Sequence, residues 1–173
     1  MENRMSTHPH HSIPPVLPPA NCFTVLVIDD LPQNRMILGK FLKAAGYAVI
    51  EATNGVEALD LLRDGHVRPD LIVTDVEMPV MDGITLVEQI RYLDGAVASV
   101  PIITASGNAD EDMRRDSLAV GSNIFMTKPF DLRVLAREIA TLLKGSRRPG
   151  PREQLNDSAV GGNRIDQGLK INS

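Results

Sequence analysis

Five polar residues, each at the end of a short apolar run or directly after one, could take part in chemistry: Asp29, Asp30, Asp75, Ser106 and Lys128. Singly, each is more often a helix cap, a turn residue or a solvated charge. As a set they supply three carboxylates, a hydroxyl and an ammonium group. Crowded carboxylates repel one another, and a hard Mg²⁺ ion binds their oxygens and offsets the repulsion. Brought together, the five side chains would form a site for a divalent cation and a phosphoryl group.

Asp75 is the member of this set with the features of a nucleophile. The apolar run 71–73 precedes it and the turn-forming segment 78–83 follows it, so that a carboxylate is presented on a loop. Such a carboxylate can attack phosphorus and form an acyl phosphate, while the metal and Lys128 take up charge on the transferring group. Ser106 could then donate its hydroxyl to a phosphoryl oxygen.

The elements that must position these residues alternate regularly along the chain. Continuous apolar runs predict strands at 24–28, 48–50, 71–73, 101–105 and 124–127. Amphipathic segments predict helices from Pro32 to Gly46, from Asn54 to about Gly65, from Ile84 to Leu93, from Asn108 to before Gly121, and from Leu132 to Leu143. Five strand-helix units imply an α/β fold with a parallel, doubly wound sheet and helices on both faces. Such sheets bind ligands beyond the carboxyl ends of their strands, where all five polar residues are expected.

Local signals predict how the helices begin and which side they bury. Pro32 suits a first helical turn, and two pairs resemble capping boxes, Asn54 with Glu57 and Asn108 with Glu111. The first helix repeats apolar residues at three- and four-residue spacing: Met36, Ile37, Phe41, Leu42 and Ala45. This spacing predicts an apolar stripe along the helix.

Composition narrows the class of protein. With 173 residues, 43% of them hydrophobic, the chain is long enough for a real core, and no run approaches the roughly 18 apolar residues of a membrane span. The N-terminus has no basic region followed by an apolar run, and the single cysteine, Cys22, cannot form an internal disulfide, so we expect a cytoplasmic protein. Residues 23–144 carry 18 acidic and 12 basic residues, which argues against direct nucleic-acid binding.

The two ends of the chain differ from its centre in composition. Residues 1–22 contain five prolines and the histidines His8, His10 and His11, and they predict a disordered or polyproline-like arm. A metal site from these histidines is disfavoured because no fixed backbone would hold them in geometry. Residues 145–173, rich in Gly, Pro, Arg and Asn, predict a disordered tail. A single domain is expected at residues 23–144.

The segment from Phe23 to about Leu143 resembles the receiver domain of bacterial two-component response regulators. Four segments carry the resemblance: Val27-Ile28-Asp29-Asp30, Asp75-Val76-Glu77-Met78-Pro79-Val80-Met81-Asp82-Gly83, Pro101-Ile102-Ile103-Thr104-Ala105-Ser106 and Lys128-Pro129-Phe130. Their joint order and spacing are specific to that domain, where a lone Lys-Pro or Asp-Asp pair would mean little. The resemblance covers about 70% of the chain and neither end.

The resemblance implies a flavodoxin-like sheet of five strands in the order 2-1-3-4-5 with five helices. It implies that Asp75 accepts a phosphoryl group from a histidine kinase or a phosphotransfer protein. Asp29, Asp30 and Asp75 would hold Mg²⁺ with the backbone carbonyl of Glu77, and the Lys128–Pro129 bond is expected to be cis. The protein would then be no enzyme for other substrates, but a phosphoacceptor that catalyses its own phosphorylation and dephosphorylation.

Some positions depart from the commonest receiver pattern. Ser106, which the resemblance makes a switch residue, stands where threonine is more usual, which keeps the hydroxyl and loses a methyl group. Phe125 stands at the aromatic switch position, where tyrosine is frequent, so that it lacks a hydroxyl to bond. Glu77 and Asn108 stand where the family varies, beside the path of the hydrolytic water, and they do not fix the lifetime of the phosphoryl group.

The favoured reading is a single-domain response regulator whose phosphorylation switches a protein-binding face, with a phosphorelay intermediate or phosphate sink close behind. The C-terminal segment has too few apolar residues for a DNA-binding helix-turn-helix, so output is expected through protein contacts. A Mg²⁺-dependent aspartyl phosphatase would need an Asp-x-Asp spacing that Asp29-Asp30-Leu31 lacks. A flavodoxin-like cofactor carrier would need a Ser/Thr/Gly-rich loop after the first strand, where Leu31-Pro32-Gln33-Asn34 stands.

Overall fold

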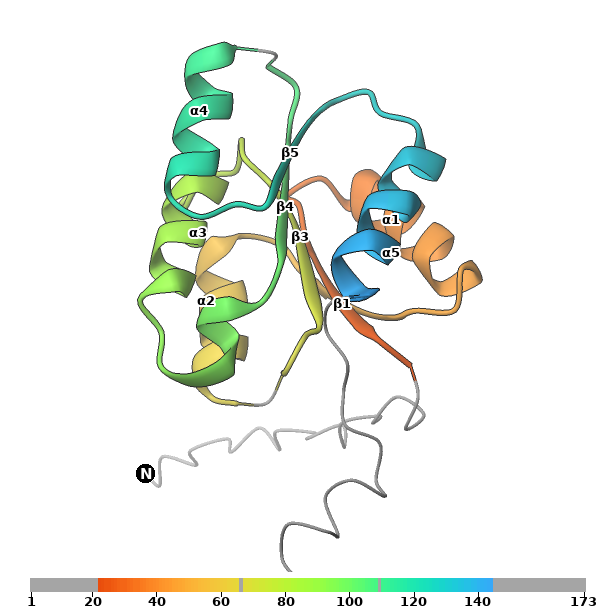
Figure 1. Cartoon of the computed structure of the whole chain (residues 1–173), viewed down its shortest axis with the longest axis horizontal. Coiled ribbons are helices and arrows are strands. Elements are labelled where there is room, and N and C mark those ends of the chain that lie inside the picture. The colour runs from red at the N-terminus through yellow and green to blue at the C-terminus, as the bar shows by residue number, and fades with distance from the viewer. Residues whose placement is uncertain (1–21, 66, 109, 145–173) are drawn as a thin grey trace, which may run out of the picture.

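The computed structural model describes residues 22–65, 67–108 and 110–144, and the predicted arm and tail lie outside these residues apart from Cys22 (Figure 1). The elements in chain order are β1 (Thr24–Ile28), α1 (Pro32–Ala44), β2 (Ala48–Ala52), α2 (Gly55–Arg63), β3 (Leu71–Asp75), α3 (Gly83–Arg91), the short 3₁₀ helix η1 (Gly95–Ser99), β4 (Ile102–Ser106), α4 (Glu111–Ala119), β5 (Ile124–Thr127) and α5 (Leu132–Lys144). Within the described part of the chain, no helix is long and apolar enough to cross a membrane.

All five strands pair in parallel in the order β2-β1-β3-β4-β5, which confirms the predicted fold class and strand order. Helices α1 and α5 cover one face of the sheet, and α2, α3 and α4 cover the other (Figure 1). Because β1 lies between β2 and β3, the chain reverses its direction of winding after β2. The carboxyl ends of β1 and β3 therefore lie side by side at the point where ligands bind in such sheets.

Two hydrophobic clusters, one on each face of the sheet, hold the helices in place. Alternate residues of the central strands enter opposite clusters, because side chains alternate across a strand. Toward α2 and α3 lie Leu26, Ile28, Ile72 and Ile102 with Leu59, Leu86 and Ile90. Toward α1 and α5 lie Val25, Val27, Val73 and Ile103 with Leu42, Leu135 and Ile139. β1, β3 and β4 are buried along their whole length, as their continuous apolar runs predicted.

Several boundaries differ slightly from the sequence-based expectation. Strand β2 continues to Ala52 and β4 to Ser106, whereas Pro101 stands just before β4. Helix α3 begins at Gly83 and ends at Arg91, and η1, which was not predicted, fills the connection to β4. The predicted helix stops are confirmed, because Gly46 and Gly121 adopt positive φ angles of 92° and 109° just beyond α1 and α4.

The predicted apolar stripe of α1 is only partly buried. Met36 and Ile37 are 50% and 54% exposed, whereas Leu42 is fully buried and Leu38 packs against the cluster beside it. Gly39 faces β2, where an added Cβ would lie 2.9 Å from the carboxylate of Glu51. Gly39 and Leu42 are therefore buried on α1, whereas Met36 and Ile37 stay about half exposed.

The capping predictions succeed for α2 and fail for α4. Asn54 accepts a hydrogen bond from the Glu57 N–H at 3.0 Å, and the Glu57 carboxylate accepts one from the N–H of Thr53. Helix α4 is capped by Asp110, not by Asn108, because the N–H of Asn108 donates to the side chain of Ser106 in a tight turn. The chain is still turning at Asn108 and becomes helical only after Asp110.

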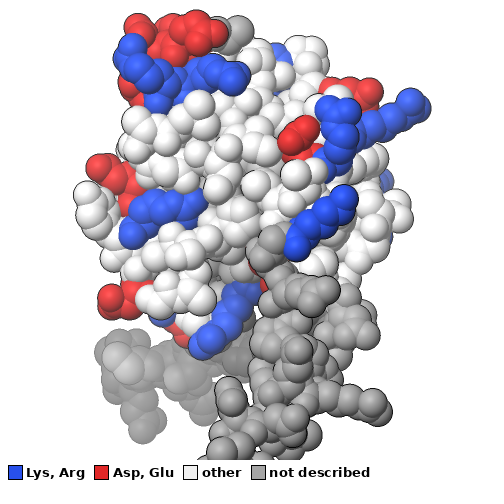
Figure 2. Space-filling view, viewed as in Figure 1, with Lys and Arg blue, Asp and Glu red and all other residues white. Residues whose placement is uncertain are grey.

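Helix α4 is the least firmly anchored of the helices that cover the sheet. Its one buried residue is Ser117, and its outer side carries acidic and basic side chains next to one another at the upper left of Figure 2. On this helix, Arg115 pairs with Asp112 at 2.7 Å and with Asp116 at 3.1 Å. Such exposed pairs contribute little to stability, so α4 is held mainly by the contacts on its side that faces the sheet.

Candidate functional site

The five polar residues singled out in the sequence follow the carboxyl ends of four strands. Asp29 and Asp30 come directly after β1, and Asp75 is the last residue of β3. The strand register pairs Asp75 with Ala105, one residue before Ser106, and the Lys128 N–H donates to the Ser106 carbonyl at 2.7 Å. The parallel sheet thus carries all five residues to one edge of the molecule, as the sequence predicted.

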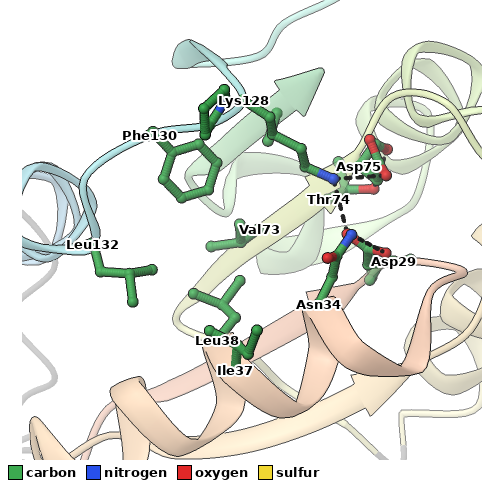
Figure 3. Close-up of a pocket in the computed structure, with 13 residues that line it drawn as sticks. Asp29, Asn34, Ile37, Leu38, Val73, Thr74, Asp75, Lys128, Phe130 and Leu132 are labelled. Atoms are coloured by element: carbon green, nitrogen blue, oxygen red, sulfur yellow. Dashed lines mark hydrogen bonds and ion pairs between the residues drawn. The ribbon is translucent and has the colours of Figure 1, made fainter. Parts of the chain in front are cut away.

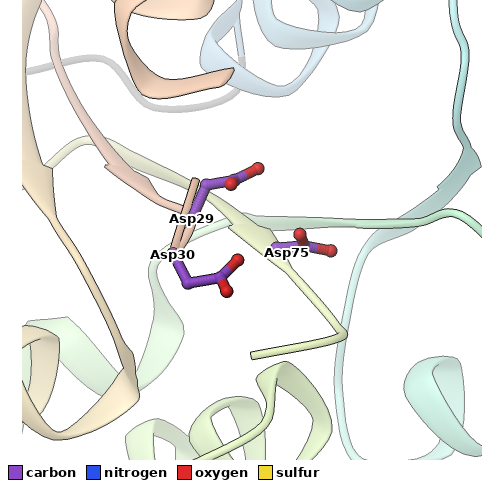
Figure 4. Close-up of side chains that lie close together, drawn as sticks. All are labelled: Asp29, Asp30 and Asp75. Carbon is purple, nitrogen blue, oxygen red and sulfur yellow. The ribbon is translucent and has the colours of Figure 1, made fainter. Parts of the chain in front are cut away.

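The three carboxylates form a compact acidic cluster (Figure 4). Asp29, Asp30 and Asp75 each offer a carboxylate oxygen, and these oxygens lie within 4.8 Å of one another. Asp29 and Asp75 are buried, whereas Asp30 is partly exposed. Mg²⁺ prefers hard oxygen ligands at about 2.1 Å and keeps several waters, so a cluster of this size, open on one side, fits that ion. The Glu77 carbonyl as a further ligand stays a prediction.

Lys128 joins two members of this cluster. Its Nζ donates to Asp75 Oδ2 at 2.7 Å and to Asp29 Oδ2 at 2.9 Å (Figure 3). The Lys128–Pro129 peptide bond is cis, as expected. The ammonium therefore sits between the residue proposed to accept a phosphoryl group and a predicted metal ligand.

Burial and charge act against each other in this site. Burial raises the pKa of Asp75 above its usual value and the charge of Asp29 acts in the same direction, whereas the hydrogen bond and charge of Lys128 oppose the rise. Burial lowers the pKa of Lys128, but its hydrogen bonds to Asp75 and Asp29, together with their charges, outweigh burial and raise that pKa. Lys128 is thus a permanent cation at neutral pH.

Two residues of α1 that the sequence analysis did not select complete the site. The Asn34 amide donates to both carboxylate oxygens of Asp29 at 3.1 Å. The Arg35 guanidinium donates to the backbone carbonyls of Asp29 and Asp30 at 2.6 and 3.1 Å. The sequence does carry a signal for these two residues, since both lie in the first turn of the helix that Pro32 starts. Side chains of a helix lean back toward its N-terminus, and here this directs them toward the end of β1.

Glu77 has a second role besides its predicted backbone contribution. Its carboxylate accepts a hydrogen bond from the Gly107 N–H at 2.9 Å, and this bond joins the loop after β3 to the loop after β4. Its own N–H donates to Asp75 Oδ1 at 3.3 Å. The two loops that border the acidic cluster are therefore tied to each other.

The two predicted switch residues are both buried. Phe125, in β5, is 7% exposed. The described hydrogen bonds of the Ser106 hydroxyl go to Asn108 and to Met113, in the following loop and α4, and not to the acidic cluster. The structure therefore gathers Asp29, Asp30 and Asp75 into one cluster, bonds Lys128 to two of them, and directs the described bonds of the Ser106 hydroxyl elsewhere.

An apolar pocket opens beside the ion pairs of Lys128 (Figure 3). Its polar end is formed by Asp29, Asn34, Asp75 and Lys128. The rest is lined mainly by side chains from α1 and from the segment after β5: Ile37, Leu38, Pro129, Phe130 and Leu132. A reacting group at the acidic cluster would therefore have apolar surface next to it.

Comparison with known proteins decides the family. Residues 25–140 match the family described as the response regulator receiver domain. The chain belongs to this family. Receiver domains are the phosphoacceptors of two-component systems, and they interact with histidine kinases or phosphotransfer proteins.

The fold and sequence of this receiver are similar to solved receiver domains. That of a signal transduction histidine kinase from Syntrophus aciditrophicus is 32% identical, with a TM-score of 0.68, over 75% of this chain and 96% of that one. The chemotaxis response regulator CheY4 of Vibrio cholerae is 30% identical, with a TM-score of 0.63, over 70% of this chain and 99% of that one.

The curated relatives include much longer proteins. The sensor histidine kinase CheAY of Helicobacter pylori is 34% identical over 122 residues, which are 70% of this chain. The matched part makes up 15% of CheAY, and for the Escherichia coli sensor protein EvgS, which is 39% identical over 119 residues, it makes up 10%. The receiver therefore matches one module of these proteins.

Proposed function

We propose that this receiver accepts a phosphoryl group on Asp75, in a Mg²⁺-dependent reaction, from a histidine kinase or a phosphotransfer protein. The observation that carries the proposal is the position of Asp75: at the end of β3, in an acidic cluster and 2.7 Å from Lys128. The proposed module spans residues 23–144 and works in the cytoplasm, where its phosphodonor would be found.

The chemistry follows from the groups around Asp75. A carboxylate oxygen of Asp75 forms a bond to phosphorus as the phosphorus–nitrogen bond of a phosphohistidine donor breaks, and the released imidazole nitrogen takes up a proton from water. Lys128 moves its ammonium from the Asp75 oxygen to an oxygen of the arriving phosphoryl group, which needs only a small displacement. Asp29, Asp30, Asp75 and the Glu77 carbonyl would hold Mg²⁺, which supplies positive charge toward the phosphoryl oxygens.

Neighbouring residues keep these groups in position. Asn34 fixes the carboxylate of Asp29, and Arg35 fixes the backbone of the aspartate pair. Partners of this kind orient metal ligands and raise metal affinity. After transfer, the phosphorylated Asp75 side chain has a larger negative charge and new acceptor oxygens. The Ser106 hydroxyl can donate to one of these oxygens if the loop after β4 moves inward. The face formed by α4, β5 and α5 would change with it and bind a protein target.

We favour a single-domain response regulator as the role of this module. A phosphorelay intermediate or phosphate sink is the second candidate, because CheAY and EvgS, which share this module, are described as sensor proteins. Phosphotransfer assays distinguish the two roles. A relay intermediate passes its phosphoryl group on to a second phosphotransfer protein, whereas a regulator loses it to water.

Acceptor identity is tested by incubating the protein with Mg²⁺ and acetyl phosphate. One phosphoryl group should be added per chain, and hydroxylamine should remove it, as it cleaves acyl phosphates. Asp75→Asn should not be labelled, because an amide is not a nucleophile at phosphorus. Asp60→Asn, which changes an exposed carboxylate on α2, is the matched control and should be labelled like the unmodified protein. Equal labelling of the Asp75 variant would reject the assignment, and steady turnover of simple phosphomonoesters would favour a phosphatase.

A further inference from the structure

The hydroxyl of Ser106 is fully buried at the end of β4 and already has partners. The N–H of Asn108 donates to its oxygen at 2.9 Å. The hydroxyl donates in turn to the thioether sulfur of Met113, in α4, at 3.1 Å. A hydroxyl has one hydrogen and donates to one acceptor at a time. The donor that a phosphoryl group on Asp75 would require is therefore occupied in this structure.

A second hydroxyl, two residues earlier in β4, also reaches α4. Thr104 Oγ1 lies 2.7 Å from the hydroxyl of Ser117, and both residues are buried. Residues two apart on a strand share a face, and so do residues four apart on a helix. Thr104 therefore contacts Ser117, and Ser106 contacts Met113, as two parallel contacts between β4 and α4. Since Ser117 is the single buried residue of α4, these two contacts are its main attachment to β4.

Met113 has space into which it can move. Its side chain is partly exposed and borders a surface hollow whose other walls come from the β3–α3 loop and α3, among them Val76, Met78 and Ile84. Methionine is unbranched and adapts readily to a new contact. The thioether can thus leave the Ser106 hydroxyl without a cavity opening in the core.

We propose that Met113 is a positioning residue for Ser106: its sulfur holds the hydroxyl toward α4 until a phosphoryl group on Asp75 competes for the same hydrogen. A thioether is a weak acceptor, whereas a phosphoryl oxygen is charged and strong, so the exchange runs toward the phosphoryl group. Losing the sulfur contact frees the first turns of α4, while Thr104 and Ser117 still hold its centre. This coupling rests on the proposed phosphorylation of Asp75.

The test uses Mg²⁺ with beryllofluoride, a phosphoryl mimic, and measures its affinity by calorimetry. Met113→Leu keeps the side-chain volume and removes the acceptor, which leaves the buried Ser106 hydrogen unpaired. The unmodified state is destabilised and affinity should rise about threefold to tenfold, the range that one ordinary hydrogen bond gives. Met113→Gln restores an acceptor and should return the affinity to the unmodified value or below it. Met36→Leu, an exposed methionine on α1, is the matched control and should change nothing.

A double-mutant cycle separates this role from simple packing. In a Ser106→Ala background the hydroxyl is gone, so Met113→Leu should no longer alter beryllofluoride affinity. The Met113 ¹³C-methyl NMR signal should also move when beryllofluoride binds the unmodified protein, and less so in Ser106→Ala. An equal gain in both backgrounds, or no gain in either, would overturn the role of Met113 while leaving Asp75 as acceptor. A failure of the unmodified protein to bind beryllofluoride would overturn the proposed function as well.

Discussion

At the acidic cluster, the ammonium group of Lys128 and a bound Mg²⁺ ion would compete for the same carboxylate oxygens. Lys128 occupies the Oδ2 atoms of Asp75 and Asp29, two of the carboxylates that would hold Mg²⁺. The ammonium and the metal ion are both positive, so each weakens the binding of the other at this distance. Asp30 makes no described contact with Lys128 and is more exposed, which suits it to be a metal ligand first. Substitutions of Asp30 and of Lys128 should therefore have different effects on Mg²⁺ affinity.

Asp30→Asn removes a charged oxygen ligand and should weaken Mg²⁺ binding about tenfold or more, slowing phosphorylation by acetyl phosphate in parallel. Lys128→Ala should slow phosphorylation too, yet leave Mg²⁺ affinity unchanged or about tenfold tighter, because a nearby positive charge is gone. Mg²⁺ titrations followed by NMR measure both effects.

Lys40→Ala, which removes an exposed lysine of α1, is the matched control for the charge change and should leave both properties as they are. A loss of Mg²⁺ affinity in Lys128→Ala would contradict the division of roles between charge and metal ligation.

Among the elements, the loop from β3 to α3 is constrained by close backbone contact at Gly83. Gly83 lies directly against the backbone of Asp75, so a Cβ there would collide with the Asp75 carbonyl and lie 2.9 Å from Val76 Cα. Its N–H also donates to the Val76 carbonyl at 2.9 Å. Within this loop Val80 has a φ of 71° and is 88% exposed, a conformation that costs a β-branched residue energy. The loop is thus held in shape by backbone contact close to the phosphoacceptor.

Gly83→Ala should therefore destabilise the fold by about 3 kcal/mol, the cost of forcing extra atoms into a packed site. The displaced Asp75 backbone should slow phosphorylation beyond what the loss of stability explains. Urea unfolding and acetyl phosphate labelling of the folded fraction measure the two effects.

Gly65→Ala provides the comparison, since Gly65 has a φ of 66° but no atom within 4 Å of an added Cβ. It should cost about 1–2 kcal/mol from backbone strain alone and leave labelling unchanged. Equal behaviour of the two variants would show that the contact with Asp75 is unimportant.

At the scale of the whole molecule, α4 is attached to the sheet less firmly than the other helices are. Helices α1 and α5 bury leucine and isoleucine side chains between them and the sheet, as α2 and α3 do on the opposite face. Helix α4 buries only Ser117, whose hydroxyl contacts that of Thr104 in β4. A change at Asp75 should therefore displace α4 and the adjoining β5 before it disturbs any other element, because the weakest attachment yields first.

Ser106→Ala should still accept a phosphoryl group on Asp75, since the nucleophile and Lys128 are intact. The phosphorylation-dependent amide NMR shifts of residues 108–130 should shrink, because the hydroxyl that couples the phosphoryl group to the loop is missing. Labelling measured by mass spectrometry on the same samples controls for incomplete phosphorylation. Undiminished shifts in this variant would exclude the hydroxyl as the coupling element.

The sequence by itself determined the fold class and most of the site. In a chain of alternating βα units, continuous apolar runs such as 24–28 and 71–73 form parallel strands that are buried on both faces. Because the strands are parallel, their carboxyl ends lie at the same edge of the sheet. Asp29, Asp30, Asp75 and Lys128 could therefore be placed together without coordinates. Their residue types then set the chemistry, because a carboxylate cluster and an ammonium have few other uses there.

Only the tertiary structure decided which atoms meet. Helical spacing fits Met36 and Ile37 as well as it fits Leu38 and Leu42, but only the packing of α1 on the sheet buries Leu42 and leaves Met36 and Ile37 about half exposed. In the same way, no local rule pairs Ser106 with a residue of α4, because that contact depends on how far the helix sits above β4. Periodicity and residue type are properties of a segment, whereas helix rotation and hydroxyl partners depend on the packing of segments that are distant in sequence.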